Sequence, residues 1–165
     1  MKRALVIGGS NGIGMAIAYC LSESYMVTVI DKSEPDNVLS DRCDFVRFDL
    51  TSSAYSLFDR YSNVDLVMVT AGFGSLALFK DIDEPLINSY FTVNTISVIR
   101  IVKHFYNRLM AAGDFHFGVM VSIAGFMSSP FFSVYGATKA ALKVFIESVN
   151  VELEKGGSRN RILNV

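Results

Sequence analysis

The sequence has no tryptophan, only two cysteines and three prolines, and no long hydrophobic segment. Cys20 and Cys43 are too few for a disulfide framework, and we expect both to be reduced thiols in a cytoplasmic protein. No apolar run approaches the ~20 residues that span a bilayer, so we expect no membrane segment. The first apolar run follows Lys2 and Arg3 but ends in a glycine loop, which argues against a signal peptide.

Strong charge of either sign is also missing. The formal net charge is −1 and the chain has no basic cluster, which argues against nucleic acid or an anionic membrane as a partner. Hydrophobic residues make up 51% of the chain and charged residues 19%, a composition that hints at a buried oligomer surface. A chain of 165 residues can bury a core without metal or disulfides, so we expect one domain over residues 1–165 and no metal site.

The N-terminal pattern predicts a βαβ unit. Residues 4–7 form an all-apolar run, typical of a strand buried on both faces, and the sequence GGSNGIG follows at once. Apolar residues then recur at helical spacing over residues 13–24, and a second apolar strand over residues 26–30 ends at Asp31. This order predicts parallel strands with a right-handed crossover.

The rest of the chain continues the alternation. We predict strands over residues 44–48, 64–70, 118–122 and 161–165, and helices over residues 54–61, from about 85, over 95–110 and over 135–153. The strands are apolar without alternation, which indicates an α/β fold: a doubly wound parallel sheet in three α/β/α layers.

The helix predicted over residues 95–110 carries two apolar stripes. One stripe can cover the sheet, and the other needs a second partner, for which another subunit is the candidate. The first comprises Val98, Ile101, Val102, Phe105 and Leu109, and the second Ile96, Ile99, Tyr106 and Met110.

The glycine loop is a candidate cofactor site. Gly8, Gly12 and Gly14 allow a tight turn, close approach of a pyrophosphate and an open helix N-terminus, although glycines also occur in ordinary turns. Asp31 at the end of the second strand can accept hydrogen bonds from ribose hydroxyls and would repel a 2′-phosphate, or it is simply a turn residue. The pattern favours NAD over NADP.

A serine, a tyrosine and a lysine form a candidate catalytic set. Tyr135 and Lys139 share one helix face at i, i+4 spacing. A free phenol titrates near ~10, and a cation at ~4 Å with an effective dielectric of about 20 favours its ionised form by roughly 4 kcal/mol. That is enough for about three pK units. Alternatively the pair is solvated, Ser122 ends a strand and Asn94 caps a helix.

These residues, in this order and spacing, resemble the short-chain dehydrogenase/reductase family, in its non-extended, NAD-preferring branch, across essentially the whole chain. The resemblance implies a Rossmann fold and an NAD(P)-dependent oxidoreductase that transfers a hydride between a nicotinamide and an alcohol or carbonyl substrate. It further implies that Tyr135 is the general acid/base and that Ser122 hydrogen-bonds the substrate oxygen. Lys139 would favour the phenolate and hold the nicotinamide ribose, and Asn94 would support a water-linked proton path.

The same resemblance extends the predicted cofactor site. It assigns Asp49 to the adenine edge, and adds residues beside Asp49 and in the two glycine loops: Ser10, Asn11, Ile13, Leu50, Ala71 and Gly72. Where the family has Thr and two Asn at strand ends, this chain has Ile7, Val69 and Thr70. The substrate pocket would lie partly at residues 124–133, whose phenylalanines indicate either an apolar substrate or a core or interface.

The resemblance also implies a homodimer or homotetramer through the helices at 95–110 and 135–153. The family's chain continues past the sixth strand into a substrate-covering segment and a seventh strand, so we expect this chain to be shortened at its C-terminal side. A different class of function stays open: a non-catalytic NAD(P)-binding sensor or assembly protein built on the same scaffold.

Overall fold

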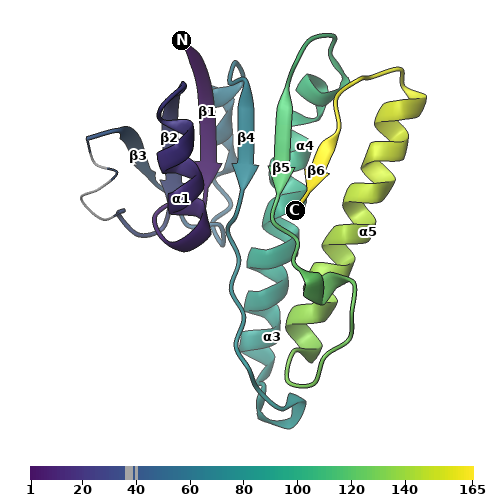
Figure 1. Ribbon diagram of the computed structural model, residues 1–165. Helices are drawn as coiled ribbons and strands as arrows, with labels where there is room; N and C mark the ends of the chain where they lie inside the picture. The colour runs from purple at the N-terminus through teal and green to yellow at the C-terminus, as the bar shows by residue number, and fades with distance from the viewer. Residues whose placement is uncertain (36–38, 40) are drawn as a thin grey trace.

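A parallel sheet forms the centre of the computed structural model, which describes residues 1–35, 39 and 41–165 (Figure 1). The sheet has six described strands in the order β3-β2-β1-β4-β5-β6, and every adjacent pair is parallel. The strands are β1 (Lys2–Ile7), β2 (Tyr25–Asp31), β3 (Cys43–Arg47), β4 (Leu66–Val69), β5 (His116–Val119) and β6 (Ile162–Asn164). The order reverses between β1 and β4, which confirms the predicted doubly wound fold.

Helices cover both faces of this sheet (Figure 1). The α-helices are α1 (Gly12–Leu21), α3 (Glu84–Phe91), α4 (Ser97–Met110) and α5 (Ser133–Lys155). Short turns of other helix types are η1 (Tyr55–Tyr61), η2 (Phe79–Asp81), η3 (Thr92–Ile96) and η4 (Ile123–Gly125). Helix α1 packs on one face, whereas α4 and α5 pack on the other. No helix in the described part of the chain has the length and hydropathy to cross a bilayer.

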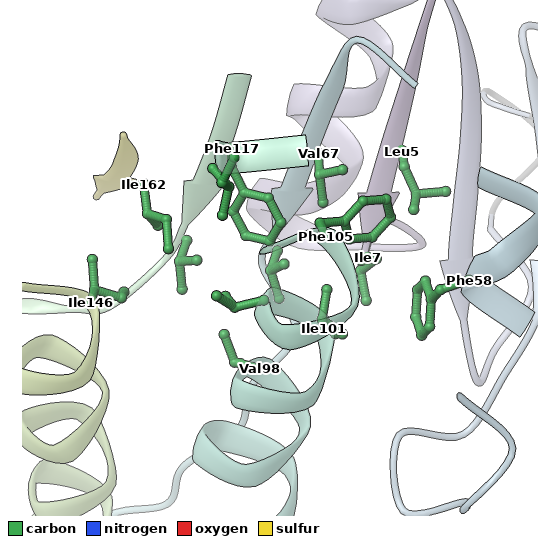
Figure 2. Close-up of a cluster of buried hydrophobic side chains, with 14 of the residues drawn as sticks. Leu5, Ile7, Phe58, Val67, Val98, Ile101, Phe105, Phe117, Ile146 and Ile162 are labelled. Carbon is green, nitrogen blue, oxygen red and sulfur yellow. The ribbon is translucent and has the colours of Figure 1, made fainter. Parts of the chain in front are cut away.

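The larger core lies between the sheet and the α4/α5 face (Figure 2). The first predicted stripe of α4 is fully buried there, and each such side chain contributes about 1.5–3 kcal/mol relative to leaving it exposed. The residues labelled in Figure 2 come from the sheet, η1 and the two helices: Leu5, Ile7, Phe58, Val67, Val98, Ile101, Phe105, Phe117, Ile146 and Ile162.

Two residues of the second predicted stripe pack within the chain itself, where we expected another subunit. Tyr106 and Met110 pack at the edge of the larger core, and the Tyr106 hydroxyl lies 3.4 Å from Oε2 of Glu152 on α5. These two side chains therefore find their partner within the same chain. Ile96 at the other end of the stripe remains 41% exposed.

Three predicted elements differ in detail. Residues 55–61 form a 3₁₀ helix instead of an α-helix, with Phe58 buried and the Tyr55 and Phe58 rings 5.7 Å apart. The helix predicted from residue 95 is preceded by a π turn over Thr92–Ile96, in which Ser97 N donates to Thr92 O. Strand β5 ends at Val119, and at Ser122 the backbone turns away with φ of 107°.

Candidate active site

The carboxyl ends of the central strands border a cavity of ≈ 620 Å³. This edge is where open α/β sheets bind ligands, at the point where the strand order reverses. Its lining includes most of the residues predicted to bind the cofactor, namely Gly8, Asn11, Ile13, Gly14, Asp31, Asp49, Leu50, Ala71 and Gly72, together with Lys32, Thr51, Thr70 and Phe73. Ser10, Gly12 and Lys139, the last of which was predicted to hold the nicotinamide ribose, are not among the lining residues.

The first glycine loop is glycine-rich because two strand ends meet there. Gly8 has φ of 87°, a left-handed conformation that favours glycine, and an added Cβ would overlap the backbone nitrogen of Ala71. An added Cβ on Gly14 would overlap the Gly8 carbonyl oxygen and Oγ1 of Thr70. The Thr70 hydroxyl lies 2.9 Å from Gly8 O and 3.1 Å from Ile7 O. Thr70 thus ties the end of β4 to the loop after β1.

Helix α1 presents an open N-terminus to this loop. Its N-cap residue Asn11 is extended, with φ of −151°, and makes no side-chain capping bond, and the first turn carries no acidic residue. The first N–H groups of a helix lack intrahelical partners and carry a partial positive charge. The Ile13 side chain, 63% exposed, lines the cavity beside them. This end of α1 is therefore suited to an anionic group such as a pyrophosphate.

Asp31 connects the end of β2 to the glycine loop. Its Oδ2 accepts from Ser10 N at 3.1 Å, and its Oδ1 accepts from Lys32 N at 2.7 Å. The buried Ser10 hydroxyl donates to Ser33 O at 2.6 Å. Ser10 therefore joins the two loops through internal hydrogen bonds. The carboxylate of Asp31 is held at the cavity edge.

Asp49 is held by the turn that follows it. Its Oδ1 accepts from both the backbone nitrogen and the hydroxyl of Thr51, each at 2.8 Å. These two hydrogen bonds hold the pKa of Asp49 below its usual value, and the charge of Lys32 acts in the same direction. Asp49 is therefore charged at neutral pH. Leu50 is buried next to it, and Leu50 O accepts from the Tyr55 hydroxyl at 2.8 Å.

A second cavity of ≈ 500 Å³ brings together two residues of the predicted catalytic set, Ser122 and Tyr135. The Tyr135 ring packs against Gly74, where an added Cβ would lie 2.6 Å from ring atom Cδ2. The Ser122 hydroxyl oxygen accepts from Ala124 N at 3.2 Å at the start of η4. The loop after β4 is a wall of both cavities, because Phe73 lines the first and Gly74 the second.

Lys139 lies beneath this loop and is 3% exposed. Its Nζ donates to Met120 O at 3.0 Å and lies 5.8 Å from the centre of the Tyr135 ring. Burial lowers the pKa of Lys139 to about 8. An added Cβ on Gly72 would lie 3.2 Å from this Nζ, so a glycine there leaves space for the ammonium group.

Asn94 is fully buried in the π turn and lines neither cavity. Its Oδ1 accepts from Phe73 N at 2.9 Å, and its Nδ2 donates to Phe73 O at 2.8 Å and to Oγ1 of Thr138 at 3.2 Å. The Asn94 side chain thus fastens the loop after β4 to helix α5.

Sequence reasoning overlooked Thr138. Its Oγ1 lies 2.7 Å from Tyr135 O, and its own carbonyl accepts from Oγ1 of Thr95 at 3.0 Å. Its position three residues after Tyr135 and directly before Lys139 could have indicated a residue on the inward face of α5. Among the described residues, no three His, Cys, Asp or Glu side chains are grouped so as to hold a metal ion.

Comparison with known proteins gives consistent matches. The sequence model of a family described as short chain dehydrogenase matches residues 2–162. The dehydrogenase RED2 of Cochliobolus heterostrophus is 28% identical over 167 residues, which cover 96% of this chain and 63% of that protein. This chain therefore spans less than two thirds of the length of that relative.

Solved structures agree with this match. A protein of the short chain dehydrogenase/reductase family is 26% identical, with a TM-score of 0.87 over 99% of this chain and 73% of that one. An alcohol dehydrogenase from Thermococcus sibiricus, complexed with 5-hydroxy-NADP, is 22% identical and has a TM-score of 0.84 over 99% of this chain and 74% of its own. At that identity the second structure supports the fold alone.

Proposed function

Because the chain belongs to the short-chain dehydrogenase family, we propose that it is an NAD(P)-dependent oxidoreductase that interconverts an alcohol and a carbonyl compound. The observation that carries the proposal is the shared wall between the two cavities. A ligand in the first cavity would reach the loop at Phe73, and Ser122 and Tyr135 lie on the far side of Gly74. A cofactor and a substrate can therefore meet across this loop.

The first cavity suits a dinucleotide. The open N-terminus of α1 would hold the pyrophosphate, Asp31 the adenosine ribose and Asp49 the adenine edge. We propose NAD as the preferred cofactor, since a carboxylate at position 31 would repel a 2′-phosphate. The positive charge of Lys32, next to Asp31, would reduce this preference for NAD over NADP. When bound, the nicotinamide supplies or accepts the hydride.

The residues of α5 and η4 would handle the proton. In carbonyl reduction, Tyr135 gives its hydroxyl proton to the substrate oxygen, and Ser122 donates a hydrogen bond to the same oxygen. Nζ of Lys139 lies 5.8 Å from the centre of the Tyr135 ring, so its positive charge would attract the phenolate that this step leaves. Since the pKa of Lys139 is about 8, this lysine is mostly cationic at neutral pH. The Asn94 side chain holds the loop after β4 against α5.

Replacing Tyr135 by Phe tests the proposal. Removing the hydroxyl leaves the first cavity intact, so NADH should bind with unchanged affinity while turnover falls by at least ~100-fold. The assay is NADH oxidation over a panel of ketones and aldehydes, with fluorescence of bound NADH alongside. Tyr19→Phe is the control, because Tyr19 lies on α1 facing Arg42, outside both cavities.

Retained turnover in Tyr135→Phe would contradict the assigned role. NADH binding by the wild-type chain without turnover of any substrate would instead favour the non-catalytic sensor or assembly protein.

We further propose that residues 1–165 act as one dinucleotide-binding domain and assemble as a homodimer or homotetramer. Support comes from exposed apolar side chains on α5 and at the end of η3: Val144 at 59%, Val151 at 51% and Ile96 at 41%. Light scattering at micromolar concentration tests this assembly, and a monomer would contradict it.

A further inference from the structure

The second cavity has an uncharged lining. Apolar side chains come from Ile123, Met127 and Phe132, and the polar ones besides the proposed catalytic pair are Ser128 and Ser129. No charged side chain is among the lining residues of this described cavity. A ligand carrying a carboxylate or phosphate would find no ion-pair partner in the lining itself.

The apolar side chains around this cavity are exposed, which excludes a role in the core. Ile123 is 73% exposed, Phe126 59%, Met127 63% and Phe131 48%. Several exposed apolar side chains on one short segment are typical of a binding site. The sequence left open whether the phenylalanines at 124–133 belong to the core or to an interface. Phe126 and Phe131 are exposed and lie outside both core clusters, whereas Phe132 is half-buried.

A second loop extends the same apolar surface. Ala77 N donates to Phe131 O at 3.1 Å, so the loop before η2 lies against the loop that follows η4. Figure 1 shows both loops at the end of the molecule where α3 and α5 begin. The exposed apolar residues of the two loops, which we call the apolar rim, are Leu76, Leu78, Phe79, Ile123, Phe126, Met127 and Phe131.

The charged groups near the apolar rim are already paired or acidic. Nζ of Lys143 lies 5.0 Å from the centre of the Phe126 ring, but it forms an ion pair with Glu147 at 2.7 Å. Lys80 lies 3.4 Å from the Asp81 carboxylate. Asp83 follows on the same loop and caps α3 by accepting from Leu86 N. An anionic ligand is therefore disfavoured at this end of the molecule.

From these observations we infer that the second cavity and the apolar rim bind an uncharged ketone or alcohol that carries a large aliphatic or aromatic group. This inference rests on the proposed function, since it assigns the substrate class of the same site. The reacting oxygen lies between Ser122 and Tyr135, and the apolar group extends over Phe132 toward Met127 and the rest of the rim. A cavity of ≈ 500 Å³ has the size of sites that enclose small organic ligands.

A series of straight-chain methyl ketones tests the inference. Each added methylene that enters an apolar site improves binding about fourfold, so kcat/KM should rise by roughly that factor per carbon until the cavity is filled. A keto acid with the same carbon count, ionised at its far end, should bind at least ~10-fold more weakly. Binding is measured separately, as the shift in thermal midpoint of the NADH complex at increasing ketone concentration.

Two variants of matched exposure locate the contact. Met127 is 63% exposed beside the cavity, and Leu163 is 64% exposed on β6, outside both the cavity and the rim. Met127→Ser should lower kcat/KM for the longest ketone by several-fold, and so weaken the dependence of kcat/KM on chain length. Leu163→Ser should leave that dependence unchanged.

The outcomes separate this inference from the proposed function. Binding that strengthens with chain length but gives no turnover would overturn the proposed reaction and leave the substrate class standing. Binding or turnover independent of chain length, a keto acid that matches its ketone, or equal effects of the two variants would overturn the substrate class. Failure of every ketone to bind the NADH complex would also overturn the substrate class, whether or not a dimer covers the rim.

Discussion

Thr138 offers the sharpest test of how the candidate site is held together. Its hydroxyl is fully buried, lies 2.7 Å from Tyr135 O and accepts from Asn94 Nδ2 at 3.2 Å. Thr138→Val keeps the shape of the side chain and removes only this hydroxyl. Valine and threonine have similar helix propensities, so the change acts through the lost hydrogen bonds.

The expected magnitude follows from what Asn94 loses. In Thr138→Val, Nδ2 of Asn94 keeps its bond to Phe73 O but has one N–H left buried without a partner. An unsatisfied buried donor costs about 1–3 kcal/mol of the free energy of unfolding. For a protein of this size that lowers the thermal midpoint by about 2–12 °C. Phe73 should also be held less firmly, so turnover should fall more than NADH affinity does.

A double-mutant cycle with Asn94→Ala separates this linkage from a general loss of packing. Because the two side chains share a hydrogen bond, their effects on the free energy of unfolding should couple by about 0.5–3 kcal/mol. Thermal or urea unfolding of the four proteins supplies the numbers, and Thr138→Ser, which retains the hydroxyl, should keep the turnover. Additive effects of the two substitutions, or a Thr138→Ser variant as slow as Thr138→Val, would refute the reasoning.

Three further predictions concern other parts of the molecule. Gly14→Ala should destabilise the protein more than Gly12→Ala in urea unfolding, because a Cβ on Gly14 overlaps the Gly8 carbonyl oxygen, whereas at Gly12 no atom lies within 4 Å of an added Cβ and the cost is the left-handed φ of 53° alone. Phe58→Ala should cost about 3–5 kcal/mol of the free energy of unfolding, since this ring is fully buried. Burial lowers the pKa of Lys139 from 10.5 to about 8, so the folded state binds fewer protons than the unfolded state between these values. The stability of the wild type relative to Lys139→Met should therefore rise from pH 8 to pH 10.5, by up to ~3 kcal/mol, and a constant difference would contradict it.

The parts of the fold that follow local pattern could be read from the sequence. The apolar run that becomes β1 is buried over residues 4–7, and Val27, Val29 and Ile30 of β2 are buried as well. Such runs contain their own signal. The first glycine loop could also be predicted, since Gly8 and Gly14 stand between a predicted strand and a predicted helix. Glycine is needed at these positions because a Cβ would overlap with Ala71 or Thr70, some sixty residues later. That overlap is visible only once the strands lie side by side.

Other features depend on contacts distant in sequence. The Asn94 side chain bonds the backbone of Phe73, 21 positions earlier, and no spacing rule connects the two. The left-handed backbone of Ser122 reflects the turn into η4, while its residue type suggested an ordinary strand end. The 3₁₀ form of residues 55–61 could not be read from the aromatic spacing, because residues three apart share one face in a 3₁₀ helix and in an α-helix alike. The roles of the candidate catalytic residues stay predictions until they are measured.

The π turn over Thr92–Ile96 gives this chain a place where its length can change with little repacking. A π turn holds one residue more than an α-helical turn, so deleting a single residue there would turn it into continuous α-helix. Both kinds of turn complete about one rotation around the helix axis, so α4 would keep nearly the same orientation relative to α3. Ile101 and Phe105 would still face the sheet. A one-residue deletion within α4 itself would instead rotate all residues after it by about 100°.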